Sequence, residues 1–214
     1  MRFRGKVIVA TKPGGAIGAE FMMMKVFNET NSKLMVLFVV ACQLISASCQ
    51  RQLYPGQSFQ NIENSAERKK LNDFLNSGAE KHLDTKTASA DAIIETAEQY
   101  IGVPHCMGGT TMKCMDCSGL LVTVFAKQGI TLPHNSEEQA RYGKIISRID
   151  ELRKGDLVFF IRTYETSHFI THSGIFAGSS KFIHASSKNG VIITSMNDPW
   201  WNQRFVFGTR VLKQ

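Results

Sequence analysis

One cysteine of the chain stands at the start of a predicted helix, where its chemistry would change. The sequence Asp116-Cys117-Ser118-Gly119 opens an apolar run that ends at Gly129, so we expect Cys117 in the first helical turn. The partial positive charge of a helix N-terminus stabilises a thiolate, and unpartnered first-turn amides can bind an oxyanion. Cys117 is therefore the candidate nucleophile, with Asp116 and Ser118 as candidates beside the oxyanion.

A pair of histidines could supply the base that this nucleophile needs. His172 and His184 lie in two predicted strands that form a hairpin. If 177–179 is the turn, the two histidines lie directly opposite each other on one face of the sheet. One imidazole can then accept the Cys117 proton while the other orients it. We assign the base to His172 and the orienting role to His184, and the inverted order also fits because the turn is assumed.

The remaining elements must position these three residues. Apolar residues at helical spacing predict helices over 61–83, from Ser89 to Pro104 with Ile101 on the buried stripe, over 118–129, and over 136–141 with Ser136 as its cap. Short β-branched or aromatic runs predict strands over 157–161, 171–176, 181–185, 190–195 and 205–212. Helices followed by strands predict an α+β fold with an antiparallel sheet of about five strands.

The N-terminal part is typical of an export leader. The apolar segment 34–45 is too short to span about 30 Å of hydrocarbon, and Lys25 and Lys33 precede it, which predicts a signal peptide over 24–49. Met22–Met24 then contains the natural start, near Met24, and we expect residues 1–23 to be an untranslated artefact of start-site choice. Cys42 and Cys49 each follow small residues, so lipidation of either could attach the chain to a membrane. Cleavage without a lipid, or a merely apolar role for both cysteines, also fits.

Composition narrows the class of protein that follows this leader. With 214 residues, 43% of them hydrophobic and 20% charged, the chain fits one ordinary domain and excludes disorder, collagen and coiled coil. We expect a tether and accessory helix over 50–88 and the main domain over 89–214. Of the net charge of +7, residues 1–49 carry +4, from six basic and two acidic residues. Since no basic run follows, we expect no nucleic-acid partner.

Taken together, these motifs resemble the NlpC family of bacterial cell-wall cysteine peptidases, whose fold is papain-like. The resemblance covers about 90–212, and the matching blocks in family order are 100–104, 108–110, 116–120, 132–133, 155–160, 172–176, 182–185 and 205–211. It implies an exported enzyme of the cell envelope, in the periplasm or anchored as a lipoprotein. That enzyme hydrolyses an amide bond in peptidoglycan stem peptides, commonly between D-γ-glutamate and a diamino acid.

The resemblance also implies roles for single residues. Cys117 would form the acyl-enzyme, His172 would be the base, and His184 occupies the third catalytic position; no metal or organic cofactor is implied. The family usually has a tyrosine twelve residues before the nucleophile, where this chain has His105. A ring N–H of His105 could replace the phenol as a donor toward substrate, although an inert His105 also fits. His134 replaces a position that is often basic or polar, and we assign it no role.

Other interpretations remain open from the sequence. Cys106 and Cys114 could form a disulfide in an oxidising compartment, or they could bind a metal with His105 and Cys117. The chain could bind wall peptides without cleaving them. It could also be a papain-like amidase or acyltransferase that acts on another bond. Trp200 and Trp201 could line a peptide groove or pack at its rim.

Overall fold

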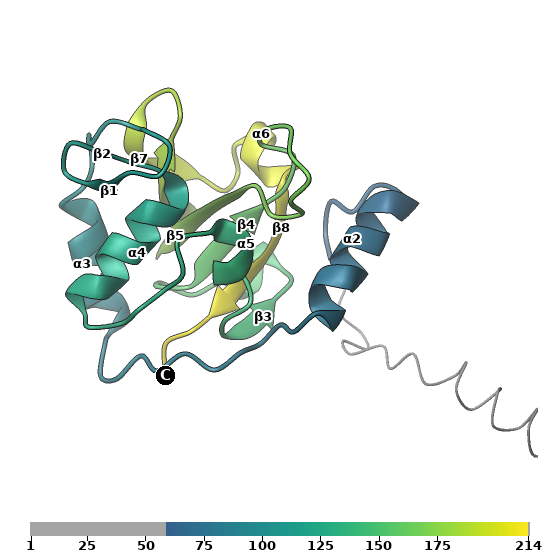
Figure 1. Cartoon of the computed structure of the whole chain (residues 1–214), viewed down its shortest axis with the longest axis horizontal. Coiled ribbons are helices and arrows are strands. Elements are labelled where there is room, and N and C mark those ends of the chain that lie inside the picture. The colour runs from purple at the N-terminus through teal and green to yellow at the C-terminus, as the bar shows by residue number, and fades with distance from the viewer. Residues whose placement is uncertain (1–58, 214) are drawn as a thin grey trace, which may run out of the picture. The chain divides into compact units, whose positions relative to one another are not determined.

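The computed structural model describes residues 59–213 and shows the expected α+β architecture (Figure 1). Six antiparallel strands form the main sheet in the order β3-β8-β4-β5-β6-β7. These strands are β3 (Lys144–Ile146), β4 (Leu157–Phe160), β5 (His172–Gly178), β6 (Lys181–Ser186), β7 (Gly190–Ser195) and β8 (Phe205–Arg210). The sequence predicted about five strands. It missed β3 because three residues are too few to show a strand pattern.

Two helices before the sheet build the side of the domain that carries the cysteine. Helix α3 (Ala90–Glu98) begins at Ser89, whose hydroxyl accepts from the Ala92 N–H, as predicted. It ends well before Pro104, so Ile101 lies outside the helix and is exposed, contrary to our expectation. Helix α4 (Cys117–Lys127) packs against α3 and against β5 and β6. The start of α4 is thereby fixed beside the strands that carry the histidines.

Short elements complete the domain around this helix pair. A small hairpin, β1 (Thr110–Thr111) with β2 (Cys114–Met115), precedes α4. The single-turn helix α5 (Ser136–Gln139) follows α4. The cap of α5 is Asn135, whose side chain accepts from the Glu138 N–H, so the predicted cap at Ser136 was wrong. The 3-10 turn η1 (Ile149–Glu151) leads into β4, and α6 (Pro199–Asn202) lies between β7 and β8. The Ser136 hydroxyl is therefore available for another contact.

The β5–β6 hairpin differs in register from our prediction. Ile175 pairs with Ile183, and the turn is Ser179-Ser180, both at positive φ, with an irregularity before Gly178. Continuing this register places Gly174, not His172, opposite His184. Two residues at positive φ form the turn that matches the twist of a hairpin, so the predicted turn over 177–179 was wrong. Because the error is two residues, both histidines still share one face.

The accessory helix α2 (Ser65–Asn76) packs on the same core as the domain. Its Phe74 ring lies 6.0 Å from the ring of Phe169 and 5.7 Å from that of Phe207. The Arg141 guanidinium donates to the Phe74 carbonyl at 3.2 Å and lies over its ring. The helix is shorter than the predicted 61–83, and Gly78 at positive φ follows its end. Two contacts between aromatic rings and one buried guanidinium hold α2 in place.

The two faces of the sheet bury separate apolar clusters. One cluster joins the sheet to α2, α3 and α4, and the other lies on the opposite face and includes Phe160, Phe182 and Phe205, with Trp201 packed against it. Among residues 59–213, no helix has the length and hydropathy needed to cross a bilayer. The predicted leader over 1–49, with Cys42 and Cys49, and the tether up to residue 58 lie outside the described residues.

Candidate active site

Cys117 occupies the first position of α4, as predicted, and Asp116 caps this helix. The Asp116 carboxylate accepts from the Gly119 N–H at 2.6 Å, from the Ser118 hydroxyl at 3.0 Å and from the Gly108 N–H at 2.7 Å. Burial would raise the pKa of Asp116, but these bonds and one to His134 lower it overall. The first turn of α4 is thus anchored by an ionised, well-bonded carboxylate.

A close backbone approach fixes the loop before the nucleophile. The Gly109 carbonyl oxygen accepts from the Asp116 N–H at 3.1 Å. A Cβ atom added to Gly119 would lie only 2.0 Å from this oxygen. Any side chain at Gly119 would push this loop off the helix. Within the described residues, the first-turn amides of Cys117 and Ser118 donate to no acceptor, so both could bind an oxyanion.

The Cys117 thiol is half-buried among polar neighbours that stabilise its charge. Its Sγ lies 3.5 Å from the Ser136 hydroxyl, which in turn lies 3.0 Å from the Ser173 hydroxyl. Burial would raise the pKa of Cys117. The positive charge of His172 and hydrogen bonds from His172, Ser136 and the Ser173 backbone overcome burial and lower the pKa from 9.0 to about 7. A substantial fraction of Cys117 is therefore thiolate at neutral pH.

A chain of hydrogen bonds runs from the base candidate into the sheet. His172 Nε2 lies 2.8 Å from His184 Nδ1, and His184 Nε2 lies 2.9 Å from the Thr194 hydroxyl. His184 is fully buried, and burial together with the charge of His172 lowers its pKa well below the ordinary value. His184 is therefore neutral, with one nitrogen that donates and one that accepts.

Trp201 covers this histidine pair. Its ring centroid lies 4.5 Å from that of His184 and 5.0 Å from that of His172. Trp200 is exposed instead, and the Arg204 guanidinium lies 4.1 Å from its ring centroid. The sequence left this pair undecided. The structure separates the two, with Trp201 packed on the imidazoles and Trp200 at the surface.

The remaining predicted residues lie around the nucleophile in different ways. The backbone of His105 pairs with Met115, two residues before Cys117, but within the described residues its side chain makes no hydrogen bond or ion pair. Its role as a donor toward substrate stays a prediction. The Ser118 hydroxyl donates to Asp116, so Ser118 can contact an oxyanion through its backbone N–H and not through its side chain. His134, to which we assigned no role, lies 3.1 Å from the Asp116 carboxylate.

Cys106 and Cys114 form a disulfide, with their Cα atoms 5.4 Å apart. A disulfide uses both sulfurs, so these two residues are not the thiolate ligands that the metal interpretation required. The bond closes the loop whose Gly108 and Gly109 contact Asp116. Cys117 is the free cysteine of the described part of the chain.

Three residues of the site were not predicted from the sequence: Ser136, Ser173 and Thr194. A fourth, Trp201, was expected only at a peptide groove or its rim, and not against the histidines. Ser173 directly follows His172, so it could have been considered by proximity alone. Thr194 lies on the strand next to His184, two residues beyond Ile192, the register partner of that histidine. A prediction of the register between β6 and β7 would have identified Thr194 as a neighbour of His184. Nothing in the sequence places Ser136 or Trp201 against residues so distant along the chain.

Comparisons with known proteins identify the family of this domain. The model of the NlpC/P60 family matches residues 102–210, about half of the chain. The murein DD-endopeptidase MepS/murein LD-carboxypeptidase of Escherichia coli K12 is 40% identical over 135 residues, covering 63% of this chain and 67% of that protein. The gamma-DL-glutamyl hydrolase of Bacillus subtilis is 39% identical over 127 residues, 58% of this chain and 30% of that protein.

A solved structure gives the same result. An NlpC/P60 family protein from Bacillus cereus superposes with a TM-score of 0.55 at 30% identity, covering 61% of this chain. This chain spans only 42% of that solved chain, so the two proteins differ outside the shared domain. Because the family model matches about half of the chain and the solved structure shares the fold of the domain, the chain belongs to the NlpC/P60 family.

Proposed function

We propose that this chain is an exported cysteine peptidase that hydrolyses an amide bond in peptidoglycan stem peptides, between D-γ-glutamate and a diamino acid. The observation that carries the proposal is the continuous contact from Cys117 through His172 and His184 to Thr194. Relatives named as murein and γ-glutamyl hydrolases support this substrate class. A binding protein without catalysis would not need a thiol whose pKa is lowered to about 7.

The reaction requires one of the two tautomer orders that the hydrogen-bond chain allows. If the Thr194 hydroxyl accepts from His184 Nε2–H, then His184 Nδ1 accepts from His172 Nε2–H. The other ring nitrogen of His172, Nδ1, is then free to take the Cys117 proton. In the reversed order, His172 Nδ1 would already hold a proton and could not act as a base. Thr194 is therefore a positioning residue that acts through His184.

The reaction then follows from the groups around Cys117. The thiol proton passes to His172 Nδ1, and the thiolate attacks the carbonyl carbon of the scissile amide. The oxyanion forms beside the amide N–H groups of Cys117 and Ser118. The His172 imidazolium returns its proton to the leaving amine, which departs and leaves a thioester on Cys117. Water, activated by His172, hydrolyses the thioester and restores the thiol.

A second bond is a specific candidate. The Escherichia coli relative is named a DD-endopeptidase, so the scissile bond of this chain could instead be a D,D peptide cross-link. The same Cys117 and His172 chemistry serves either amide. The substrate bond is decided by the pocket and not by the nucleophile.

We further propose that the chain acts outside the cytoplasm, as the murein endopeptidase name of its Escherichia coli relative suggests. Membrane attachment through a lipid on Cys42 or Cys49 belongs to this proposal. Mass spectrometry of the mature N-terminus tests it directly. A mature chain that begins with a lipid-modified Cys42 or Cys49 supports attachment, and an unmodified N-terminus downstream of both contradicts it.

Product analysis tests the main proposal. Purified protein is incubated with defined muropeptides, and new termini are identified by mass spectrometry, with Cys117→Ala as the control. A new α-amino group on the diamino acid supports γ-glutamyl cleavage, whereas conversion of cross-linked dimers into monomers, with a new side-chain amino group on the diamino acid, supports cleavage of the D,D bond. Cleavage between sugar and peptide would favour the amidase alternative. Binding of muropeptides without any product would leave the non-hydrolytic alternative.

A further inference from the structure

A second hydrogen-bond chain, separate from the one through His184, reaches the Cys117 thiol. The Ser136 hydroxyl of α5 lies 3.5 Å from the Cys117 sulfur and 3.0 Å from the Ser173 hydroxyl of β5. The Ser173 hydroxyl in turn lies 3.4 Å from the side-chain oxygen of Gln139. Ser173 and Gln139 are fully buried. The chain therefore runs from the sulfur into the interior of the domain, where its polar groups must pair with one another.

Gln139 fixes the direction of this chain. Its side-chain amide nitrogen, Nε2, donates to the Ser118 carbonyl at 2.9 Å and to the Pro133 carbonyl at 2.8 Å. Because carbonyl oxygens only accept, the amide nitrogen must face them and the amide oxygen must face Ser173. This oxygen carries no proton, so the Ser173 hydroxyl donates to it. The Ser173 oxygen then offers its lone pairs to Ser136.

The hydroxyl proton of Ser136 consequently has two alternative acceptors. While Cys117 is a neutral thiol, this proton points to the Ser173 oxygen, the nearer of the two acceptor atoms. When Cys117 is a thiolate, the sulfur becomes the better acceptor, because a hydrogen bond to a charged group is about twice as strong as a neutral one. The Ser173 hydroxyl can then rotate toward Ser136, and it gives up only a contact of 3.4 Å with Gln139, longer than an ordinary bond between oxygens.

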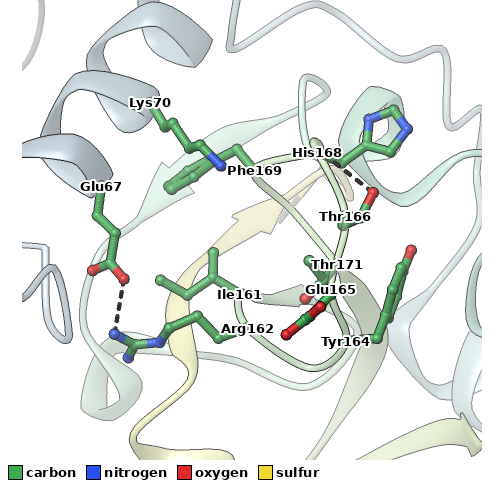
Figure 2. Close-up of a pocket in the computed structure, with 10 residues that line it drawn as sticks. All are labelled: Glu67, Lys70, Ile161, Arg162, Tyr164, Glu165, Thr166, His168, Phe169 and Thr171. Atoms are coloured by element: carbon green, nitrogen blue, oxygen red, sulfur yellow. Dashed lines mark hydrogen bonds and ion pairs between the residues drawn. The ribbon is translucent and has the colours of Figure 1, made fainter.

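The contacts of α5 hold the Ser136 hydroxyl beside the thiol. The next residue, Glu137, accepts from the Phe169 N–H at 2.7 Å, and its carboxylate lies 3.5 Å from His168 Nδ1. Figure 2 shows His168 and Phe169 on the segment that joins β4 to β5. At the other end of α5, Gln139 donates to the backbone of α4. Since neighbouring elements bind both ends of α5, rotation of the hydroxyl is enough to move the Ser136 donor between its two acceptors.

The titratable groups around the thiol belong to other elements. His172 of β5 is the cation that lowers the pKa of Cys117, and Asp116 directly precedes Cys117. Tyr164 lies on the segment between β4 and β5, and its pKa is raised first by burial and then by the negative charges of Cys117 and Asp116. Ser136 carries no charge. Removing its hydroxyl therefore changes the hydrogen bonding of the thiolate and leaves the charges around it in place.

We propose that Ser136 is a further catalytic residue of this site, whose hydroxyl donates to the Cys117 sulfur whenever that sulfur is negatively charged. Ser173 and Gln139 are positioning residues that act through Ser136. They keep its hydroxyl available without fixing it on the neutral thiol. The role in turnover rests on the proposed function, whereas the contact with the thiolate exists without substrate.

The sulfur is negatively charged at two points of the proposed reaction. After the thiol proton has moved to His172, Ser136 stabilises the thiolate that attacks the amide. In the second half, water gives a proton to His172 while its oxygen bonds to the thioester carbonyl carbon. The carbon–sulfur bond then breaks and its electron pair stays on the sulfur, where Ser136 again donates. Ser136 itself loses no proton in either step.

The pH dependence of Cys117 alkylation by iodoacetamide tests Ser136 without any substrate. The rate is measured on the full chain from the Cys117 peptide by mass spectrometry, so that the other cysteines do not contribute. Ser136→Ala should move the midpoint upward from about 7 by about 0.5–1 pH unit, because it removes one hydrogen bond to a charged group. At pH 7 this shift lowers the alkylation rate about two- to fivefold.

Two variants control for the loss of a side-chain oxygen as such. Ser136→Thr keeps the hydroxyl and should restore the midpoint of the parent chain. Thr123→Val removes a hydroxyl from α4 that donates to the carbonyls of Thr110 and Gly119 and not to the sulfur. It should leave the midpoint near 7. A Thr123→Val variant that shifts the midpoint as far as Ser136→Ala would overturn the proposal.

Ser173→Ala tests the rest of the chain. We expect a smaller upward shift of the midpoint than in Ser136→Ala, and no further shift when Ser173→Ala is added to Ser136→Ala, because Ser173 acts through Ser136. Urea denaturation establishes that each variant is folded. If Ser173→Ala does not fold, the comparison of Ser136→Ala with Ser136→Thr still decides. An unchanged midpoint in folded Ser136→Ala, or an equal effect of Ser173→Ala with and without the Ser136 hydroxyl, would overturn the proposal.

Kinetics on a muropeptide separate this proposal from the proposed function. We expect Ser136→Ala to lower kcat about two- to fivefold at pH 7 with KM unchanged, in proportion to the thiolate that is lost. If the midpoint shifts as expected but the parent chain cleaves no muropeptide, the role of Ser136 toward the thiolate stands and the proposed function falls. If the parent chain cleaves and Ser136→Ala matches it in both midpoint and kcat, the proposed function stands and the role of Ser136 falls.

Discussion

His172 and His184 are two residues out of direct register, yet their ring nitrogens lie 2.8 Å apart. Gly174 is the residue opposite His184 on β5, and a Cβ there would stand 3.2 Å from the Cβ of His184 and 2.8 Å from the Phe182 ring. The absence of a side chain at Gly174 leaves the space across which the two imidazoles meet diagonally. This relationship makes the hairpin, and not either histidine alone, the unit that builds the proposed base.

The Thr194 hydroxyl holds the tautomer of His184 in our account. Replacing it by Val keeps the shape but leaves a buried imidazole N–H of His184 without its acceptor. We expect Thr194→Val to lower kcat about tenfold or more, with little change in KM, because tautomer control by a third member supports general-base catalysis. Thr194→Ser, which keeps the hydroxyl, should retain activity. Steady-state kinetics on a muropeptide checks this, and equal rates for Val and Ser would remove the role of Thr194.

Gly174→Ala tests the space between the histidines. The added methyl group meets the Phe182 ring at 2.8 Å and the Ile183 carbonyl oxygen at 2.9 Å, so the hairpin must shift. We expect the free energy of unfolding to fall by about 1–3 kcal/mol, as overpacking a core usually does. We also expect kcat to fall by more than the loss of folded protein alone would explain. Urea denaturation and kinetics measure both, and a variant as stable and as active as the parent would contradict the packing argument.

Asp116→Ala tests the anchoring of α4. The substitution removes a cap that accepts from Gly119, Ser118 and Gly108. We expect a loss of about 1–2 kcal/mol in the free energy of unfolding, toward the upper end for a helix cap. Asp73→Ala on α2 is the matched control, because its ion pair with Lys69 is exposed and should contribute little. A loss no larger than that of the control would show that the cap is dispensable.

Much of this site could be predicted from local sequence. Asp116-Cys117-Ser118-Gly119 fixed the start of α4, because capping and helix termination depend on neighbouring residues. The shared face of His172 and His184 was also predictable, since a two-residue error in register preserves the face. The register itself was not, because Ser179 and Ser180 adopt positive φ, which serine seldom does.

Contacts between distant segments lay beyond local patterns. The Ser136 hydroxyl reaches Cys117 only because Asn135 takes the capping role. Trp201 covers the histidines from a short helix that follows β7, and its position depends on the packing of Phe160 and Phe182. The helix α2 was predicted from its periodicity, but the partner of its apolar face was not. Such contacts arise from tertiary packing, which no window of sequence contains.

The central claim is that His172 lowers the pKa of Cys117 and so activates it. The direct measurement is the rate of Cys117 alkylation by iodoacetamide as a function of pH. Because the thiolate reacts, the rate should rise with pH and reach half its plateau near pH 7. In His172→Gln, which removes the charge while burial remains, the midpoint should move upward by about one pH unit or more. His134→Gln, which contacts Asp116 and not the thiol, is the control and should leave the midpoint near 7. A midpoint that is the same in the parent chain and in His172→Gln would contradict the account.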